Sequence, residues 1–226
     1  MSEQSKIEQL PFVELNRRFR KLEEDAKSED AALASYTAGF FGRDSSYNWD
    51  DLLKEFRVVI LGEPGSGKTW ELRERVKILV ARGEFAFFIR LDQLVRRDLF
   101  ALFSDEEQRR FTKWEQSGAP AYFFLDSVDE AKFRNLSDFY STLERFSNEL
   151  GGELLVRAKI FLSSRISEWK PASDAFEIRR LFPLPPTMVR SDDDGKPKTT
   201  KDENQVPLVV HIQPRIDSKR MLPQAG

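Results

Sequence analysis

Residues 62–69 read Gly62-Glu63-Pro64-Gly65-Ser66-Gly67-Lys68-Thr69 and match the pattern GxxxxGK[ST]. They follow the apolar run Val58-Val59-Ile60-Leu61 and precede a segment with helical periodicity. Glycines allow backbone conformations that are closed to other residues, so successive N–H groups can point at phosphate oxygens. The N-terminus of the following helix would add partial positive charge beneath the anion. We therefore interpret these residues as a phosphate-binding loop, called the phosphate loop below.

Three residues at the end of this stretch add side-chain chemistry. A lysine at position 68 can reach the terminal phosphates of a nucleotide, and the Thr69 hydroxyl can ligate Mg²⁺. Trp70 either contacts the nucleotide or packs the following helix against the sheet, and its residue type favours packing. A Gly-rich turn without a ligand is the alternative, but four fixed positions match by chance in roughly one chain of this length in a hundred. The phosphate loop and Trp70 are thus the candidate nucleotide-binding residues.

Composition argues against several classes of site. The 226 residues include 36 basic and 38 acidic side chains, so no overall basic field favours nucleic acid or an anionic membrane. The chain has no cysteine and one histidine, His211, which we expect to be a buried strand residue rather than a metal ligand. The start lacks a secretory pattern, and no apolar run reaches the length of a membrane span. These features predict a cytoplasmic protein.

Apolar runs alternate with segments of helical periodicity along the chain. Five runs are predicted to be strands, at 56–61, 85–89, 121–125, 159–164 and 208–212. Helices are predicted between them: one after the phosphate loop up to Gly83, one from a capping box at Ser104 to near Gly118, and one from Ser137 to a stop at Gly151-Gly152. This alternation predicts right-handed crossovers and a mainly parallel sheet of five strands with helices on both faces.

The regions that flank this pattern are predicted to be separate units. Residues 1–47 are interpreted as an N-terminal helical extension, because apolar residues follow a helical spacing there, namely Phe12, Leu15, Phe19 and Leu22. That stripe either packs against the domain or binds a partner. Residues 48–214 would form the nucleotide-binding domain, with the polar segment 190–205 as a disordered insertion.

Acidic residues follow the third predicted strand. Asp126 stands at the strand end, where a carboxylate would hold the Mg²⁺ of a bound nucleotide together with Thr69. Asp129 and Glu130 follow, and one of them could orient or deprotonate a water that attacks the γ-phosphate. Alternatively, this pair stabilises the N-terminus of a helix. We therefore predict a metal site at Thr69 and Asp126 and catalytic roles for Asp129 and Glu130.

The segment from Phe123 to Glu130 resembles the second acidic motif of NACHT-type NTPases, which belong to the STAND class in the ASCE division of P-loop proteins. In that motif apolar residues precede Asp, a small residue, an apolar residue and Asp-Glu, here Asp126-Ser127-Val128-Asp129-Glu130. An AAA+ ATPase would have Glu where this chain has Ser127. The segment 161–165 is similar to the sensor segment of the same family, whose arginine contacts the terminal phosphate. Arg165 is either that sensor or an ordinary surface residue.

The resemblance covers about residues 48 to 170 and implies a three-layer α/β/α P-loop NTPase fold with sheet order 5-1-4-3-2. It also implies ATP or GTP with Mg²⁺ as cofactors and a signalling or antiphage-defence switch that hydrolyses ATP slowly, with weak activity in isolation. Implied partners, besides nucleotide, are a second copy or a full-length STAND relative. Residues 215–226 would be the truncated start of the family's lid segment. Two alternatives stay open: a truncated regulator that binds nucleotide or a partner without hydrolysis, and, ranked last, a small-molecule kinase.

Overall fold

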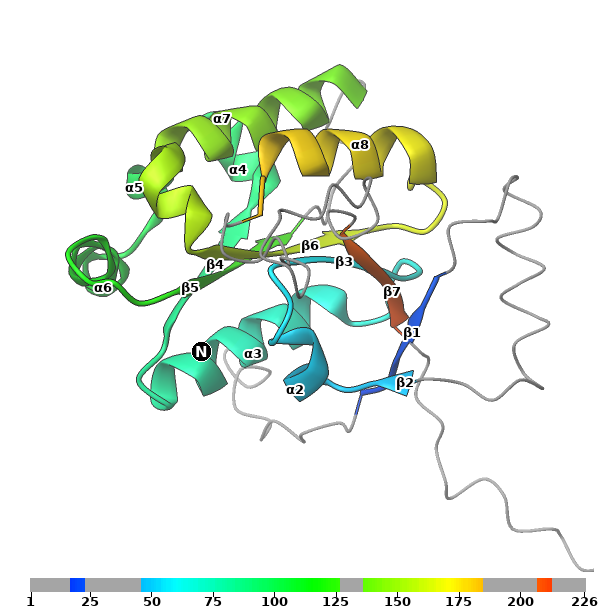
Figure 1. Cartoon of the computed structure of the whole chain (residues 1–226), viewed down its shortest axis with the longest axis horizontal. Helices are drawn as coiled ribbons and strands as arrows, with labels where there is room; N and C mark the ends of the chain where they lie inside the picture. Colours follow the sequence, from blue (N-terminus) through cyan, green and yellow to red (C-terminus); the bar gives the residue numbers. More distant parts are fainter. Residues whose placement is uncertain (1–16, 23–45, 127–135, 185–206, 213–226) are drawn as a thin grey trace, which may run out of the picture.

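A mixed seven-stranded sheet forms the centre of the computed structural model, which describes residues 17–22, 46–126, 136–184 and 207–212 (Figure 1). The strands lie in the order β2-β1-β7-β3-β6-β5-β4. Strands β7, β3, β6, β5 and β4 are parallel, whereas β1 is antiparallel to both β7 and β2. The strand bounds are β1 Phe19–Lys21, β2 Ser46–Tyr47, β3 Arg57–Leu61, β4 Phe85–Arg90, β5 Ala121–Asp126, β6 Ala158–Ser164 and β7 Leu208–Ile212.

The two antiparallel strands correct the prediction of a five-stranded sheet. The five parallel strands coincide with the predicted ones and keep the predicted order among themselves, but β1 and β2 extend the sheet beyond β7, so the complete order differs. The sequence predicts a helix across Phe19, yet Phe19–Lys21 is a strand. Phe19 is buried and lies opposite Ile212 on β7. This strand has three residues and one buried side chain. An alternation of buried and exposed residues could therefore not be recognised in the sequence.

Helices cover both faces of the sheet (Figure 1). Helices α2 and α3 lie on one face, and α4, α7 and α8 lie on the other. Successive strand residues face opposite layers: Phe124 packs in the cluster that contains α3 residues, whereas Phe123 and Leu125 pack in the cluster that contains α7 residues. Burial on both faces explains why the strands are continuous apolar runs. The helix bounds are α2 Trp49–Leu52, α3 Lys68–Ala81, α4 Leu91–Leu94, α5 Leu99–Leu102, α6 Asp105–Glu115, α7 Leu136–Val156 and α8 Pro171–Leu181.

Local chemistry sets several helix ends. The capping box predicted at Ser104 is confirmed, since its hydroxyl accepts from the Glu107 N–H and the Glu107 carboxylate accepts from the Ser104 N–H. At Gly151 the backbone leaves helical geometry, with φ of 73°, but helical turns resume and continue to Val156. The predicted stop at this glycine is therefore confirmed as a break in helical geometry, which divides α7 into two helical parts. Helices α2, α4, α5 and α8 were not predicted, and α8 starts at a proline.

Arg57 anchors the end of β3 that lies away from the phosphate loop. Its guanidinium is buried and donates to four backbone carbonyls, those of Phe56 at 2.8 Å, Phe182 at 2.8 Å, Ala158 at 2.6 Å and Pro183 at 2.7 Å. Burial lowers the pKa of Arg57 to about 10. These bonds join β3 to the start of β6 and the end of α8, which stiffens the strand that carries the loop.

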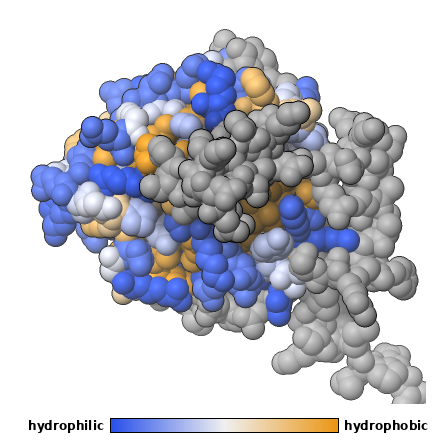
Figure 2. Space-filling view, in the orientation of Figure 1, coloured by the Kyte–Doolittle hydropathy of each residue, from blue (hydrophilic) through white to orange (hydrophobic). Residues whose placement is uncertain are grey.

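On the face shown in Figure 2, hydrophilic side chains surround smaller apolar patches. Within the described ranges the large apolar side chains that are exposed are Trp70, Val95, Phe100, Val156 and Phe176. No helix in those ranges combines the length and the apolar character needed to cross a bilayer.

The predicted domain boundaries at 47/48 and 214/215 stay predictions. The segments 190–205 and 215–226, interpreted from sequence as an insertion and the start of a lid, lie outside the described residues.

Candidate functional site

The phosphate loop connects β3 to α3 at the carboxyl edge of the parallel strands. Gly65 and Gly67 adopt left-handed backbone conformations, with φ of 75° and 85°, and Gly67 is the N-cap of α3. The Gly62 N–H donates to the Ser164 carbonyl at 3.2 Å, which joins the loop to the end of β6. A Cβ at Gly62 would lie 2.5 Å from Ile212 Cγ2, so this position must be glycine for β7 to pack against the loop.

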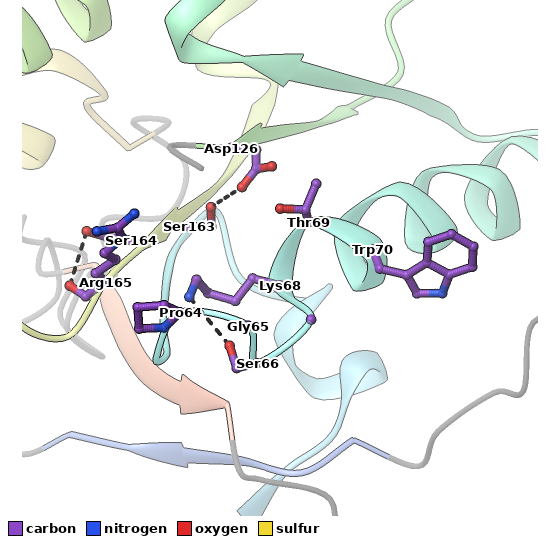
Figure 3. A pocket seen from close by; sticks show the side chains of 11 residues that line it. Pro64, Gly65, Ser66, Lys68, Thr69, Trp70, Asp126, Ser163, Ser164 and Arg165 are labelled. Atoms are coloured by element: carbon purple, nitrogen blue, oxygen red, sulfur yellow. Dashed lines mark hydrogen bonds between the residues drawn. The ribbon is translucent and has the colours of Figure 1, made fainter. Parts of the chain in front are cut away.

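The Lys68 side chain folds back over the loop (Figure 3). Its ammonium donates to the carbonyls of Gly62 at 2.5 Å and Glu63 at 3.0 Å and lies 3.4 Å from the Ser66 hydroxyl. Gly62 and Glu63 contact the Lys68 ammonium through these carbonyls, but neither residue lines the pocket described below. The charge of Lys68 is thus held beside the loop, within reach of an anion that binds to the loop.

Asp126 lies at the end of β5, buried with 1% of its surface exposed. Its Oδ1 accepts a hydrogen bond from the Ser163 hydroxyl at 2.6 Å, whereas Oδ2 is buried and makes no hydrogen bond of standard geometry within the described residues. Burial raises the pKa of Asp126 above 3.8, and the neighbouring Ser163 and Thr69 hydroxyls and the charges of Arg73 and Arg90 oppose this rise. A buried carboxylate oxygen facing a threonine hydroxyl across the loop fits the donor set of Mg²⁺.

One pocket of about 330 Å³ brings the separate sequence motifs together (Figure 3). Asp126 is the last residue of β5 and Arg165 directly follows the neighbouring strand β6, and both line this pocket with the loop. The residues that line it are Pro64, Gly65, Ser66, Gly67, Lys68, Thr69, Trp70, Asp126, Ser163, Ser164 and Arg165. Asp129 and Glu130, the predicted catalytic pair, lie outside the described residues.

Trp70 does not pack α3 against the sheet, so that prediction is wrong. Its side chain is half exposed and points away from Lys68 and Thr69 (Figure 3). The Lys77 ammonium lies 5.9 Å from the Trp70 ring centroid on the same outer face of α3. Leu72 and Val76 face the core instead, because they lie on the opposite side of the helix.

Ser163 was not predicted as a site residue. It lies opposite Asp126 in the parallel pairing of β5 and β6, so both side chains stand at the same height of the sheet. The predicted strand order alone would have placed them together, because neighbouring parallel strands end at one edge. Ser163 donates to one carboxylate oxygen of Asp126, and the other makes no hydrogen bond of standard geometry within the described residues.

His211 is buried on β7, as expected from its flanking apolar residues. Burial lowers the pKa of His211 below 6.5, the Lys68 charge acts in the same direction, and Glu63 opposes both. The folded chain therefore binds this proton less tightly than the unfolded chain. Since stability rises with pH wherever the unfolded state binds more protons, the free energy of unfolding falls as pH drops from 6.5 through the folded pKa.

We expect His211→Gln to remove this loss of stability at acidic pH. His211 is the only histidine of the chain, so no other imidazole can contribute. Melting temperatures of both proteins, followed by circular dichroism from pH 7.5 to 5, should diverge below 6.5, with the wild type losing more stability. Parallel profiles would contradict the assignment.

No family model matches the chain, and no curated protein matches it. Among solved structures, the chain is similar to AMPPCP-bound DnaA from Aquifex aeolicus at 20% identity and a TM-score of 0.32. That alignment covers 54% of this chain and 36% of the DnaA chain, so the chain spans about a third of the length of that protein. A likeness this low does not establish a shared fold, and the case for the site depends on its own geometry.

Proposed function

We propose that the chain binds a nucleoside triphosphate with Mg²⁺ and hydrolyses it slowly. The observation that carries the proposal is the buried Asp126 carboxylate in the same pocket as the phosphate loop, since its Oδ2 makes no hydrogen bond of standard geometry within the described residues. A buried carboxylate oxygen without a hydrogen-bond donor costs free energy, and coordination of a cation would offset that cost. The loop, its lysine and the helix N-terminus supply the complementary anion site beside it.

Each described residue has a distinct role in this proposal. Thr69 and Asp126 would hold Mg²⁺, which supplies neutralisation of charge on the β- and γ-phosphate oxygens when bound. The loop N–H groups would bind phosphate, and the Lys68 ammonium would exchange its carbonyl acceptors for phosphate oxygens. Arg165, at the other wall of the pocket, would stabilise charge that develops on the transferring phosphoryl group.

The finer assignment depends on the sequence motifs. Asp129 or Glu130 would accept a proton from the attacking water, and the segments 123–130 and 161–165 favour a NACHT-type switch of the STAND class. On this proposal the chain acts in signalling or antiphage defence, with ATP favoured over GTP. Its macromolecular partner would be a second copy or a full-length relative.

Calorimetry on the purified chain tests the binding step. We expect heat on titration with ATP or GTP in the presence of Mg²⁺, and a weaker signal when EDTA removes the metal. Steady phosphate release above that of Lys68→Ala would establish hydrolysis. Binding without phosphate release would favour the non-hydrolysing regulator, and the absence of heat with both purine triphosphates would overturn the proposal.

We expect Glu130→Gln to separate binding from turnover. A glutamine keeps the size of the side chain but cannot accept the water proton, so phosphate release should fall about a hundredfold while the affinity for Mg²⁺-nucleotide stays close to that of the wild type. Glu106→Gln, at the exposed first turn of α6, is the matched control and should change neither quantity. Unchanged turnover in Glu130→Gln would show that this acid only stabilises a helix end.

A further inference from the structure

Arg17, which precedes β1, contacts the phosphate loop from outside the pocket. Its Nη2 donates to the Ser66 carbonyl at 3.2 Å, and its Nε lies 3.5 Å from Glu71 Oε2. The Arg17 side chain is 12% exposed and that of Glu71 is 2% exposed, so this ion pair is largely shielded from solvent. One guanidinium therefore bridges the loop backbone and the first turn of the helix that follows it.

The edge of the sheet fixes Arg17 in this place. Phe19, two residues on, pairs with Ile212 of β7, and its ring lies 5.0 Å from the Trp49 ring in an edge-on arrangement. The Trp49 indole N–H donates to Glu71 Oε1 at 2.7 Å. Arg17 and Trp49 thus hold the two oxygens of one buried carboxylate.

The bond to the Ser66 carbonyl orients an N–H group of the loop. In a trans peptide the C=O and the following N–H point in opposite directions, and the described chain has no cis peptide bond. A Ser66 carbonyl held toward Arg17 therefore directs the Gly67 N–H to the opposite side of the peptide. Gly67 lines the pocket, and a Cβ there would lie 3.2 Å from Arg17 Nη2, so the arginine packs closely behind this peptide.

We propose that Arg17 is a positioning residue for the nucleotide site: it fixes the Ser66–Gly67 peptide and the first turn of α3 in the geometry that binds phosphate. This inference rests on the proposed function. It assigns the N-terminal segment a role in ligand affinity, in addition to its place at the sheet edge. Donors that already have the binding geometry give a higher affinity for the ligand, because less conformational entropy is lost on binding.

The test compares Arg17→Ala with Arg18→Ala in the full chain. Arg18 is the adjacent arginine; it is exposed, and its Nη1 donates to the Ser46 hydroxyl at 3.4 Å. We expect Arg17→Ala to weaken Mg²⁺-ATP binding about tenfold in calorimetry, as for the loss of a hydrogen bond from a charged group, and Arg18→Ala to leave it unchanged. A role confined to folding would lower the melting temperature alone, so the rise in melting temperature on adding nucleotide is measured as well and should shrink in Arg17→Ala.

Arg17→Lys keeps the charge near Glu71 but cannot bridge both acceptors, so its affinity should lie between those of Arg17→Ala and the wild type. This variant also replaces Arg17→Ala if the latter does not fold. Wild-type affinity in Arg17→Lys and Arg17→Ala would overturn the inference while the proposed function stands. A wild-type chain that binds no nucleotide would overturn both.

Discussion

Lys68→Ala should reduce the affinity for Mg²⁺-nucleotide at least about a hundredfold, the largest effect expected of any single change in the chain. The substitution removes the charge that would contact the terminal phosphates, and charge-assisted hydrogen bonds of this kind are among the strongest in proteins. It also removes the ammonium that bridges the carbonyls of Gly62 and Glu63, so the loop loses two internal hydrogen bonds. Calorimetry with Mg²⁺-ATP measures the loss.

Lys77→Ala is the matched control for this variant. Lys77 lies on the same helix, but its ammonium is mostly exposed and contacts Glu74 at 2.6 Å, away from the loop. It should bind nucleotide as the wild type does. Equal affinities in Lys68→Ala and Lys77→Ala would show that residues 62–69 are not the phosphate site.

Asp126→Asn should change stability and ligand affinity in opposite directions. Because burial raises the pKa of Asp126 above 3.8, the folded chain holds this proton more tightly than the unfolded chain. The free energy of unfolding therefore falls as pH rises from 3.8 through the folded pKa, and it stays lower above that pKa. Asparagine removes the buried charge and can still accept from Ser163, so the ligand-free variant should melt at a higher temperature at pH 7.

The same substitution should weaken Mg²⁺-dependent nucleotide binding about a hundredfold, because a neutral amide is a poorer ligand for a hard cation than a carboxylate. Binding measured in EDTA should change much less. Asp105→Asn, which removes an exposed charge at the start of α6, is the control and should alter neither the melting temperature nor the affinity appreciably. A destabilised Asp126→Asn that binds Mg²⁺-ATP normally would contradict the assignment of Asp126 as the metal ligand.

The parts of the site that the sequence predicted are those with strong local signals. The pattern at residues 62–69 requires glycines for its turns. The strands predicted at 121–125 and 159–164 contain consecutive apolar residues, which is typical of strands that are buried on both faces. Because parallel strands end at one edge, predicting these strands was sufficient to bring Asp126 and Arg165 to the loop. Their proximity thus follows from topology, without any information about side-chain packing.

The parts that were missed depend on contacts between distant segments. Arg17 reaches the Ser66 carbonyl across 49 residues of sequence, and Arg57 finds acceptors in Phe182 and Pro183 more than a hundred residues away. Backbone carbonyls carry no residue-specific signal, so no pattern in the sequence marks these partners. The packing prediction for Trp70 was wrong for another reason. Its aromatic character favoured burial, but its position on α3 directs the side chain outward.

The packing of Ile212 against Gly62 links the proposed nucleotide site to the order in which the chain is synthesised. The neighbour of β3 on one side is β7, some 150 residues later, and on the other side β6, about 100 residues later. A nascent chain that has not yet released residue 212 from the ribosome has an unpaired β3 edge beside the loop, and such edges favour association with other chains.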